Sequence, residues 1–308
     1  MSCTTDTQDC GISIVAEADQ FGLGQSHCAD PNREEMDYSI VLGQYPLAGG
    51  ISQASTWRNN YSTLFDGVNQ YAHTPAASTA FDTMTTSVTV SLWIKGVKPA
   101  FSGGDGIFGR WNEGAANERG WIIQGGPAGA DLDKFSVRLG YDVDTGGSVR
   151  KSYTSSIAVL DNTWHHIAFT WAGSGLSLYV DGVVDPSPTK TTDLSMSTIH
   201  VPGASVLGTR FAAYLDNGSL DGHFHGRIDE VSVYDLGFSA AMIAELYHDG
   251  EPADIQGAQF TWFGLGTELA YYRMGDGDTH PTLQGTIGPD ATMVNTTSAN
   301  IVGDVPNG

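Results

Sequence analysis

Basic residues are scarce in this chain of 308 residues. Only 14 Lys and Arg stand against 35 Asp and Glu, which gives a formal net charge of −21 at pH 7. A surface of that sign repels phosphate backbones and anionic lipid headgroups, so binding to nucleic acids or to membrane surfaces is disfavoured. The charge suits solubility, dense display on a particle, or cation binding, and solubility alone is the simplest interpretation.

Long hydrophobic runs are also missing. No segment reaches the ~20 apolar residues that a membrane-spanning helix needs. The first ten residues, Met1–Cys10, have neither the basic start nor the apolar stretch of a secretory signal. We therefore expect no membrane insertion, and a protein that stays inside its cell, leaves it without a classical signal, or travels on a particle released by lysis.

Cysteine is confined to three positions near the start of the chain: Cys3, Cys10 and Cys28. Cys3 and Cys10 could pair and leave Cys28 over, or the three could form a loose metal site with His27. No C-x-x-C spacing supports the metal site, so free thiols in an N-terminal arm are favoured. The rest of the chain has to be held together by packing.

Several sequence signatures of catalysis are absent. The chain contains no Gly-x-Ser-x-Gly elbow, no P-loop and no H-E-x-x-H helix motif. Charged residues make up only 16% of the chain, while glycine is abundant at 39 residues. Low charge with many glycines indicates short strands joined by turns, and so an all-β protein.

The clearest local pattern runs from Asn162 to Gly182. Residues 164–171 alternate in a strand pattern, residues 172–175 (Ala-Gly-Ser-Gly) form a turn, and residues 176–180 alternate again. Asp181-Gly182 starts the next reversal, since Asp-Gly favours tight hairpin turns. The sequence therefore predicts a β-hairpin that ends in a second tight turn.

Further strands and one helix follow from the same reasoning. Residues 87–95 alternate strictly, with Val88, Val90, Leu92 and Ile94 on one face. Residues 238–248 have helical spacing of apolar side chains, with Ser239 as N-cap. Residues 64–72 are predicted to form a strand, a turn and a second strand. Additional short strands are predicted at 106–110, 120–124, 134–140, 205–208, 226–234, 259–263 and 268–274.

These patterns divide the chain into three parts. Residues 1–60 are polar and irregular and predict an N-terminal arm. Residues 61–250 form the main β domain. Residues 251–308 predict a C-terminal β extension, whose strands would complete the chain's own sheet or that of a neighbour.

Four segments of the main domain together resemble a known family. They are Leu64-Phe-Asp-Gly67, residues 88–94 (V-T-V-S-L-W-I), residues 164–182 (W-H-H-I-A-F-T-W…L-Y-V-D-G) and residues 226–233 (G-R-I-D-E-V-S-V). In this order they resemble laminin G-like domains of the concanavalin A-like lectin/glucanase superfamily. The resemblance implies a two-sheet antiparallel jelly-roll sandwich with one short helix. The whole arrangement, with its C-terminal tail, is similar to laminin G-like proteins encoded by tailed bacteriophages.

The resemblance also implies calcium as the cofactor. Related jelly rolls often carry one calcium near the sheet rim, and the matching positions here are Asp66 and Asp229. Hard cations prefer such oxygen ligands. The structural alternatives are that Asp66 caps a turn and that Asp229 accepts backbone hydrogen bonds. No other cofactor is implied.

Aromatic residues near loops are the candidate glycan-binding side chains, because an aromatic ring can stack on a sugar. Trp111, Trp121 and Tyr141 lie in short strands flanked by loops. The tryptophans expected in the core are Trp93, Trp164 and Trp171. Aromatic residues in a β-sandwich usually serve packing, which remains the alternative for all of them.

Titratable pairs offer two weaker sites. Related glucanases present paired carboxylates on one strand, but on a regular strand Asp229 and Glu230 would point to opposite faces. His223 and His225 would share a face, as a metal site requires, without a visible third ligand. We therefore expect no catalytic residues and no enzymatic activity.

The leading functional expectation is a non-enzymatic virion protein on the surface of a phage particle, made in the host cytoplasm. It would be a capsid decoration, a fibre or a tail component that contacts other virion proteins and copies of itself, and that could bind host glycans. The alternative is a carbohydrate-binding lectin module not tied to a virion. A polysaccharide-degrading enzyme is the third candidate.

Overall fold

The predicted hairpin lies near one edge of a large antiparallel sheet. A computed structural model describes residues 58–76, 78–99, 104–113, 119–127, 131–141, 148–173, 175–200, 208–255, 260 and 266–306, all within the compact unit Ser55–Gly308. The predictions for the arm (apart from 58–60), the three cysteines and most of the 205–208 and 259–263 strands lie outside these residues. Every structural statement below concerns the described part of the chain.

The first sheet has the strand order β10-β9-β8-β3-β15-β1-β20, and β16 and β18 continue it from β15. Its strands are β1 (Ser62–Asp66), β3 (Ser87–Gly96), β8 (His165–Ala172), β9 (Leu176–Val180), β10 (Val183–Val184), β15 (His225–Tyr234), β16 (Glu268–Tyr272), β18 (Gly285–Ile287) and β20 (Ile301–Val302).

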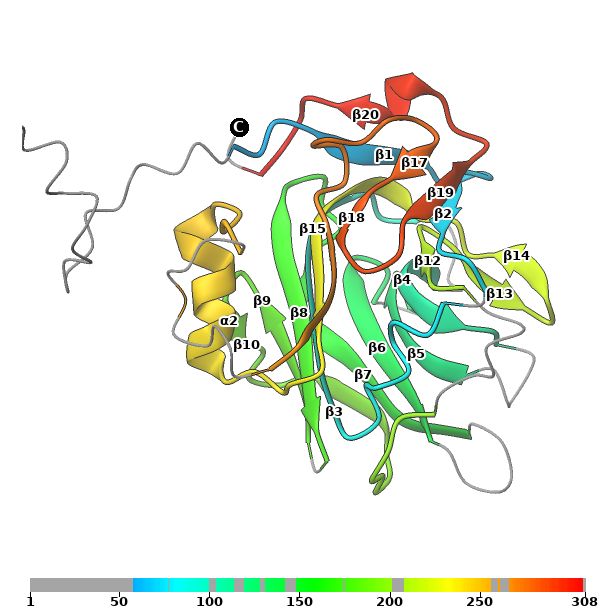
Figure 1. Ribbon diagram of the computed structural model, residues 1–308. Coiled ribbons are helices and arrows are strands. Elements are labelled where there is room, and N and C mark those ends of the chain that lie inside the picture. Colours follow the sequence, from blue (N-terminus) through cyan, green and yellow to red (C-terminus); the bar gives the residue numbers. More distant parts are fainter. Residues whose placement is uncertain are drawn as a thin grey trace, which may run out of the picture. The chain divides into compact units, whose positions relative to one another are not determined.

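The second sheet packs against the first (Figure 1) and has the order β11-β7-β6-β5-β4-β12-β2-β19-β17. Its strands are β2 (Tyr71–His73), β4 (Asp105–Trp111), β5 (Arg119–Gly125), β6 (Lys134–Tyr141), β7 (Ser148–Ala158), β11 (Thr189–Asp193), β12 (Arg210–Phe211), β17 (Thr282–Leu283) and β19 (Ala291–Val294). A separate small hairpin joins β13 (Tyr214–Asp216) to β14 (Ser219–Asp221).

The turn after β9 shows how the local sequence determines this arrangement. Asp181 and Gly182 both have positive φ, at 49° and 76°, and Val180 pairs with Val183 across the turn. Two central residues with positive φ define the tight turn whose twist matches that of a hairpin. The Asp-Gly prediction is confirmed.

One continuous apolar core lies between the sheets. Val88, Val90, Leu92 and Ile94 of β3 all belong to it, as their alternation predicts. From the second sheet, Phe108, Trp121 and Phe211 are among the residues that pack against them. The jelly-roll sandwich predicted from the sequence is confirmed.

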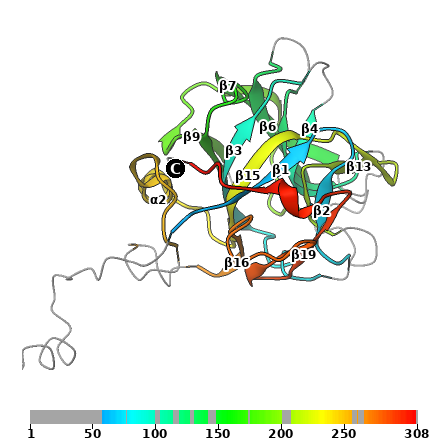
Figure 2. The same ribbon diagram turned by 90° about the horizontal axis from the view of Figure 1, so that it is seen from above.

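The single α-helix of the described residues, α2 (Ala240–Tyr247), covers part of the outer face of the first sheet. The Ser239 side chain accepts a hydrogen bond from the Met242 N–H at 3.4 Å, so the N-cap prediction is confirmed. Ile243 and Leu246 pack with Tyr179 and Tyr234 of the sheet. Figures 1 and 2 place α2 and the β13–β14 hairpin at opposite sides of the sandwich.

The C-terminal residues complete both sheets of their own chain. β16, β18 and β20 extend the first sheet, whereas β17 and β19 extend the second. Beyond β20, Asp304 accepts hydrogen bonds from Lys95 Nζ and Trp164 Nε1, each at 2.9 Å, and pairs with Arg227 at 3.1 Å. This carboxylate joins the chain end to three parts of the first sheet.

We expect the substitution Asp304→Ala to lower the free energy of unfolding by roughly 1–2 kcal/mol, because it removes charge-assisted hydrogen bonds at a half-buried site. Urea denaturation would measure the loss. The control Glu251→Ala removes an exposed carboxylate outside this cluster. Equal stability of the two variants would contradict an anchoring role for Asp304.

Candidate functional site

A row of polar side chains crosses the outer face of the second sheet. Register pairs connect Ser152 to Arg138, Arg138 to Ile122, Ile122 to Gly109, Gly109 to Arg210, Arg210 to His73 and His73 to Thr292. Paired residues share a face, and their chain neighbours Phe108, Phe211 and Ala72 lie in the core. The row therefore faces away from the core. Gly109 has no side chain and Ile122 is buried, while the other side chains of the row are at least partly exposed.

Two stacked rings lie near one end of this row. Tyr71 and His73 are two residues apart on β2 and so share the outer face. Their ring centroids are 5.9 Å apart with an interplanar angle of 26°, and both side chains are partly exposed. An aromatic platform beside polar groups is the arrangement that ligand sites for small molecules use.

A small apolar cluster divides the row near its middle. Trp111, Ile122 and Tyr214 pack together on the outer face. Glu113 Oε2 accepts hydrogen bonds from Trp111 Nε1 at 2.7 Å and from Arg138 at 2.9 Å. This carboxylate fixes the position of the Arg138 guanidinium.

A second polar row runs parallel to the first on the same face. Gln124 pairs with Ser136 and Ser136 with Thr154, and all three are buried. Gln124 Oε1 and Ser136 Oγ have no hydrogen-bond partner within the described structure. These three polar side chains lie beside the first row on the same face.

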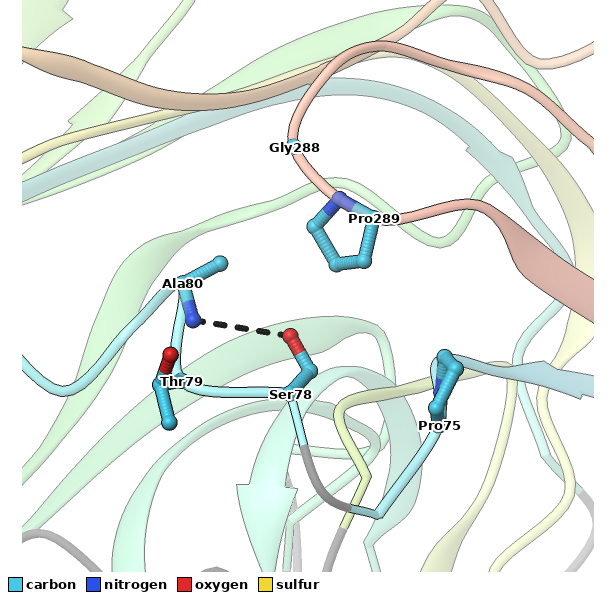
Figure 3. A pocket seen from close by; sticks show the side chains of 6 residues that line it. All are labelled: Pro75, Ser78, Thr79, Ala80, Gly288 and Pro289. Atoms are coloured by element: carbon cyan, nitrogen blue, oxygen red, sulfur yellow. Dashed lines mark hydrogen bonds between the residues drawn. The ribbon is translucent and has the colours of Figure 1, made fainter.

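One open depression, of about 490 Å³, lies between the loop after β2 and the turn before β19 (Figure 3). It is lined by Pro75, Ser78, Thr79, Ala80, Gly288 and Pro289. These residues supply hydroxyl and apolar surface but no charge and no aromatic ring. The depression therefore offers less recognition chemistry than the neighbouring sheet face.

The structure corrects the expectation that Trp111 and Trp121 are exposed near loops. Trp121 is 2% exposed in the core between the sheets, and Trp111 is 1% exposed in the small cluster on the outer face. Neither ring is open to stacking on a sugar, because neighbouring side chains cover both. Tyr141 ends β6, and its side chain lies outside the described residues.

Asp66 and Asp229 do not come together. Asp66 pairs with His225, and Asp229 lies four residues farther along β15, which separates them by about 13 Å. Two carboxylates on one calcium need oxygens within ~2.5 Å of the same ion. No cluster of three or more potential metal ligands occurs among the described residues. The pair therefore does not fit a shared calcium site.

Each of the two carboxylates has the structural role named as its alternative. Asp66 Oδ1 accepts from the N–H groups of Val68, Asn69 and Gln70 and so caps a turn. Although burial raises the pKa of Asp66, these backbone hydrogen bonds bring it below its usual range. Asp229 accepts from the Glu230 N–H at 2.9 Å and from Asn59 Nδ2 at 2.8 Å.

Asp229 and Glu230 depart from the expected strand alternation. A β-bulge follows Asp229, and Glu230 has a φ of 48°. Both carboxyl groups are buried, and they interact: burial and the neighbouring Glu230 hold the pKa of Asp229 well above its usual range. The prediction of opposite faces was wrong, because the bulge breaks the two-residue period.

The bulge pair is nevertheless closed to substrate. Tyr271 Oη donates a hydrogen bond to Glu230, and Arg273 lies 3.6 Å from Glu230 Oε1. Burial is the main cause that raises the pKa of Glu230 to about 7. With Asn59 on Asp229, these side chains shield both carboxyl groups from the surface. Glycosidase chemistry needs two carboxyls on either side of an accessible bond.

The histidines of the hairpin belong to the scaffold. His166 is buried, which lowers its pKa to about 4, and its Nε2 lies 2.7 Å from Ser91 Oγ. The hydrogen bond to Asp181 raises the pKa of His165. His225 is exposed at the start of β15, whereas His223 is half-buried, and no third ligand completes a site in the described chain.

The local sequence pattern does not predict which side chains the register brings together on the outer face. Tyr71, His73, Arg138 and Arg210 come from three different strands, and two of these strands are only two or three residues long. The sequence does show that Tyr71 and His73 occupy alternate positions, which places both rings on one face if the segment forms a strand. Their pairing with arginines depends on strand order, which the local pattern does not contain.

No helix in the described residues is long and apolar enough to cross a membrane. A search of curated protein sequences returned no match.

Solved structures share the sandwich architecture. A protein of Bacteroides ovatus, provisionally described as carbohydrate-binding, aligns over 81% of this chain with a TM-score of 0.53 and 19% identity. The alignment spans 62% of that protein's chain. At this identity the likeness shows the fold alone.

Two further structures align less well. The heptameric SAP-like pentraxin of Limulus polyphemus matches at a TM-score of 0.42 and 14% identity, over 61% of this chain and 82% of its own. The CBM40 of the Ruminococcus gnavus IT-sialidase, bound to α2,3-sialyllactose, matches with a TM-score of 0.43 and 9% identity. That alignment covers 60% of this chain and 97% of the CBM40 chain.

The family model described as the concanavalin A-like lectin/glucanases superfamily matches residues 66–244, which is more than half of the chain. Those residues run from the end of β1 into α2 and so include most strands of both sheets. The chain belongs to the concanavalin A-like lectin/glucanase superfamily, in its laminin G-like branch.

Proposed function

We propose that this protein is a non-enzymatic carbohydrate-binding protein and that the outer face of its second sheet is the binding surface. The observation that carries the proposal is the partly exposed row with Arg138, Arg210 and His73, next to the Tyr71 ring. Sugars present hydroxyl groups and apolar ring faces, which match hydrogen-bonding side chains beside an aromatic ring. Family membership and the provisional description of the Bacteroides ovatus protein support the same function.

The non-enzymatic part of the proposal rests on the carboxylates. Related glucanases use paired carboxylates on one strand, and the candidate pair here is Asp229 and Glu230 of β15. Both carboxyl groups are buried on the outer side of the first sheet. Substrate on the second sheet would be separated from it by the core. If Asp229→Asn and Glu230→Gln abolished cleavage of any glycan by this protein, the non-enzymatic proposal would be overturned.

A glycan array probed with the full chain tests carbohydrate binding. We expect a defined set of glycans to bind, and calcium and EDTA arms separate metal-dependent from metal-independent recognition. Calcium-dependent binding remains a proposal. The residues that bind the ion would have to be other than the pair Asp66 and Asp229. No bound glycan under either condition would rule out the function.

The substitution Tyr71→Ala tests the location of the site. Loss of the exposed ring is expected to weaken glycan affinity about tenfold, or ~1.4 kcal/mol. Tyr61→Ala is the matched control, because Tyr61 is 47% exposed and precedes β1 of the other sheet. Equal effects of the two substitutions would place the site elsewhere.

Display on a phage particle is our second candidate, and it does not exclude glycan binding. It rests on the similarity of the chain's organisation to phage laminin G-like proteins and on the net charge of −21, which suits dense display. Other virion proteins and copies of this chain would be the partners. Mass spectrometry of purified virions tests the location, and absence of the protein from the particle would refute it.

A further inference from the structure

Residues 58–61 lie against the buried carboxyl groups of β15 without belonging to a strand. They precede β1, and Arg58, Asn60 and Tyr61 are exposed while Asn59 is partly buried. The preceding 57 residues of the chain are joined to the domain through this segment. Since no neighbouring strand pairs with these residues, other groups have to hold them in place.

The carboxylate of Asp276, in the turn after β16, holds the end of the segment. It accepts hydrogen bonds from the backbone N–H groups of Asn60 at 2.8 Å and Tyr61 at 3.3 Å, and from Asn60 Nδ2 at 3.2 Å. Gly275 has a φ of 137°, and a Cβ at this position would lie 2.8 Å from the Tyr61 Cβ. The turn and the segment are therefore in direct contact.

Two further side chains hold the start of the segment. Asp229 accepts a hydrogen bond from Asn59 Nδ2 at 2.8 Å, and Arg273 donates one to the carbonyl oxygen of Arg58. Asp229 is fully buried, and Asn59 lies between it and the surface. Movement of the segment away from the domain would therefore admit water to the Asp229 carboxyl group.

The groups that hold the segment also surround Glu230. Its carboxyl group accepts from Tyr271 and lies 3.6 Å from Arg273, which pairs with Asp276 at 3.4 Å as well. The side chain of Glu230 is 5% exposed and that of Asp276 is 7% exposed. With Asp229, three nearly buried carboxyl groups share this region with a single guanidinium group.

Protonation relieves this excess of carboxyl groups. Burial and the neighbouring Glu230 hold the pKa of Asp229 well above its usual range, and burial raises the pKa of Glu230 to about 7. On the same strand, burial raises the pKa of Tyr234 well above its usual range, so that its hydroxyl stays neutral. If water reached the carboxyl pair, the pKa of Glu230 would move towards its ordinary value near 4.5.

We propose that residues 58–61 are a proton-dependent latch, which holds the preceding chain to the domain while the pair Asp229 and Glu230 is protonated and releases it when the pair ionises. The docked latch keeps a proton that the opened, hydrated pair gives up. Docking is therefore favoured at low pH and is weakened as pH rises through about 7. This device does not depend on carbohydrate binding by the second sheet.

The latch is the part of the cluster's cover that can open at the smallest cost. Tyr271 belongs to β16, which pairs with β15, so its removal from Glu230 would break a sheet. Residues 58–61 are held by the side chains of the cluster and precede the first strand. Local opening of segments with few backbone hydrogen bonds needs less free energy than global unfolding.

Trypsin cleavage of the full chain after Arg58 measures the opening. When the segment recloses faster than it is cut, the cleavage rate follows the population of the open form. We expect the rate for the wild type, divided by that for Glu230→Gln at the same pH, to rise about tenfold from pH 6 to pH 8, because one proton is released. Taking the ratio cancels the pH dependence of trypsin, and mass spectrometry of the fragment that begins at Asn59 gives each rate.

Two variants support this comparison. Glu251→Gln changes an exposed carboxylate outside the cluster and should follow the wild type. Asp276→Ala removes the acceptor of residues 60 and 61 and should be cut rapidly at both pH values. If circular dichroism shows that Asp276→Ala does not fold, Asn59→Ala, which removes one hydrogen bond at the surface, takes its place.

Two results would overturn the latch. One is a ratio of wild type to Glu230→Gln that is the same at pH 6 and pH 8. The other is cleavage after Arg58 that rises only in step with cleavage after Arg227, inside β15, because that pattern reports unfolding of the whole domain.

Discussion

Replacing Trp121 with alanine is expected to lower the free energy of unfolding by about 3–5 kcal/mol. The ring is 2% exposed and lies at the meeting point of the two sheets. Its centroid is 5.1 Å from that of Phe108, 6.2 Å from that of Phe81 and 6.3 Å from that of Phe169. Removing the indole leaves a cavity that rigid strands on both sides cannot close. Urea denaturation followed by tryptophan fluorescence and circular dichroism would measure the loss.

The substitution Trp111→Ala provides the comparison. Trp111 is equally buried, but it packs on the outer face in a small cluster with Ile122 and Tyr214, against which Val149 lies. We expect a smaller loss of stability there, because the β13–β14 hairpin can shift to fill part of the space. A loss below 1 kcal/mol for Trp121→Ala, or a larger loss for Trp111→Ala, would contradict these assignments.

The two tryptophans also show what sequence reasoning could predict. Both lie in short strands flanked by loops, and the sequence alone treats them alike. A register shift between Arg110 and Trp111 at the end of β4 accompanies the change of face at that point. Bulges are tertiary features that leave little trace in the hydrophobic pattern.

The main strands were predictable because their alternation is strong. In β3 and β8, apolar residues of the core recur at every second position, whereas in β15 the bulge after Asp229 lengthens one interval to three residues, from Ile228 to Val231. The Asp181-Gly182 turn and the Ser239 N-cap are local chemical signals, and both were confirmed. Such features need no knowledge of distant residues.

Strand β7 shows where that reasoning ends. Its sequence, Ser148–Ala158, is rich in Ser, Lys and Arg, yet Tyr153 is buried in the core. The strand pairs on both sides, with β6 and β11, so that its hydrogen bonding comes from neighbours rather than from an apolar pattern. The polar row of the outer face is invisible for the same reason, because strand order creates it.

The buried pair at the bulge of β15 leads to the second large effect. We expect the wild-type protein to become less stable as pH rises, and we expect the Glu230→Gln variant not to show this decrease. Burial raises the pKa of Glu230 to about 7, from an ordinary value near 4.5. Between these two values the native state keeps a proton that the unfolded chain has released. The stabilisation is complete below about pH 4.5 and is lost as pH rises through 7.

The expected size follows from proton linkage. A shift of this order corresponds to roughly 3 kcal/mol between pH 4.5 and 8, at about 1.4 kcal/mol per pH unit. The variant should therefore be more stable than the wild type at pH 8, with the difference shrinking towards pH 5. Glutamine can still accept the Tyr271 hydrogen bond, and Asp276 still pairs with Arg273 at 3.4 Å.

Other titrating groups also make the free energy of unfolding depend on pH. The difference in this free energy between variant and wild type therefore has to be compared, rather than either protein's pH curve alone. Burial lowers the pKa of His166 to about 4, so the wild type also loses stability as pH falls from 6.5 towards 4. That loss is common to both proteins and cancels in the difference. Urea midpoints measured from pH 5 to 8 would give the difference in stability between Glu230→Gln and the wild type, with the exposed Glu251→Gln variant as control. A difference that is constant across this range would show that Glu230 is ionised throughout, and that the bulge of β15 holds a charged carboxylate against Arg273.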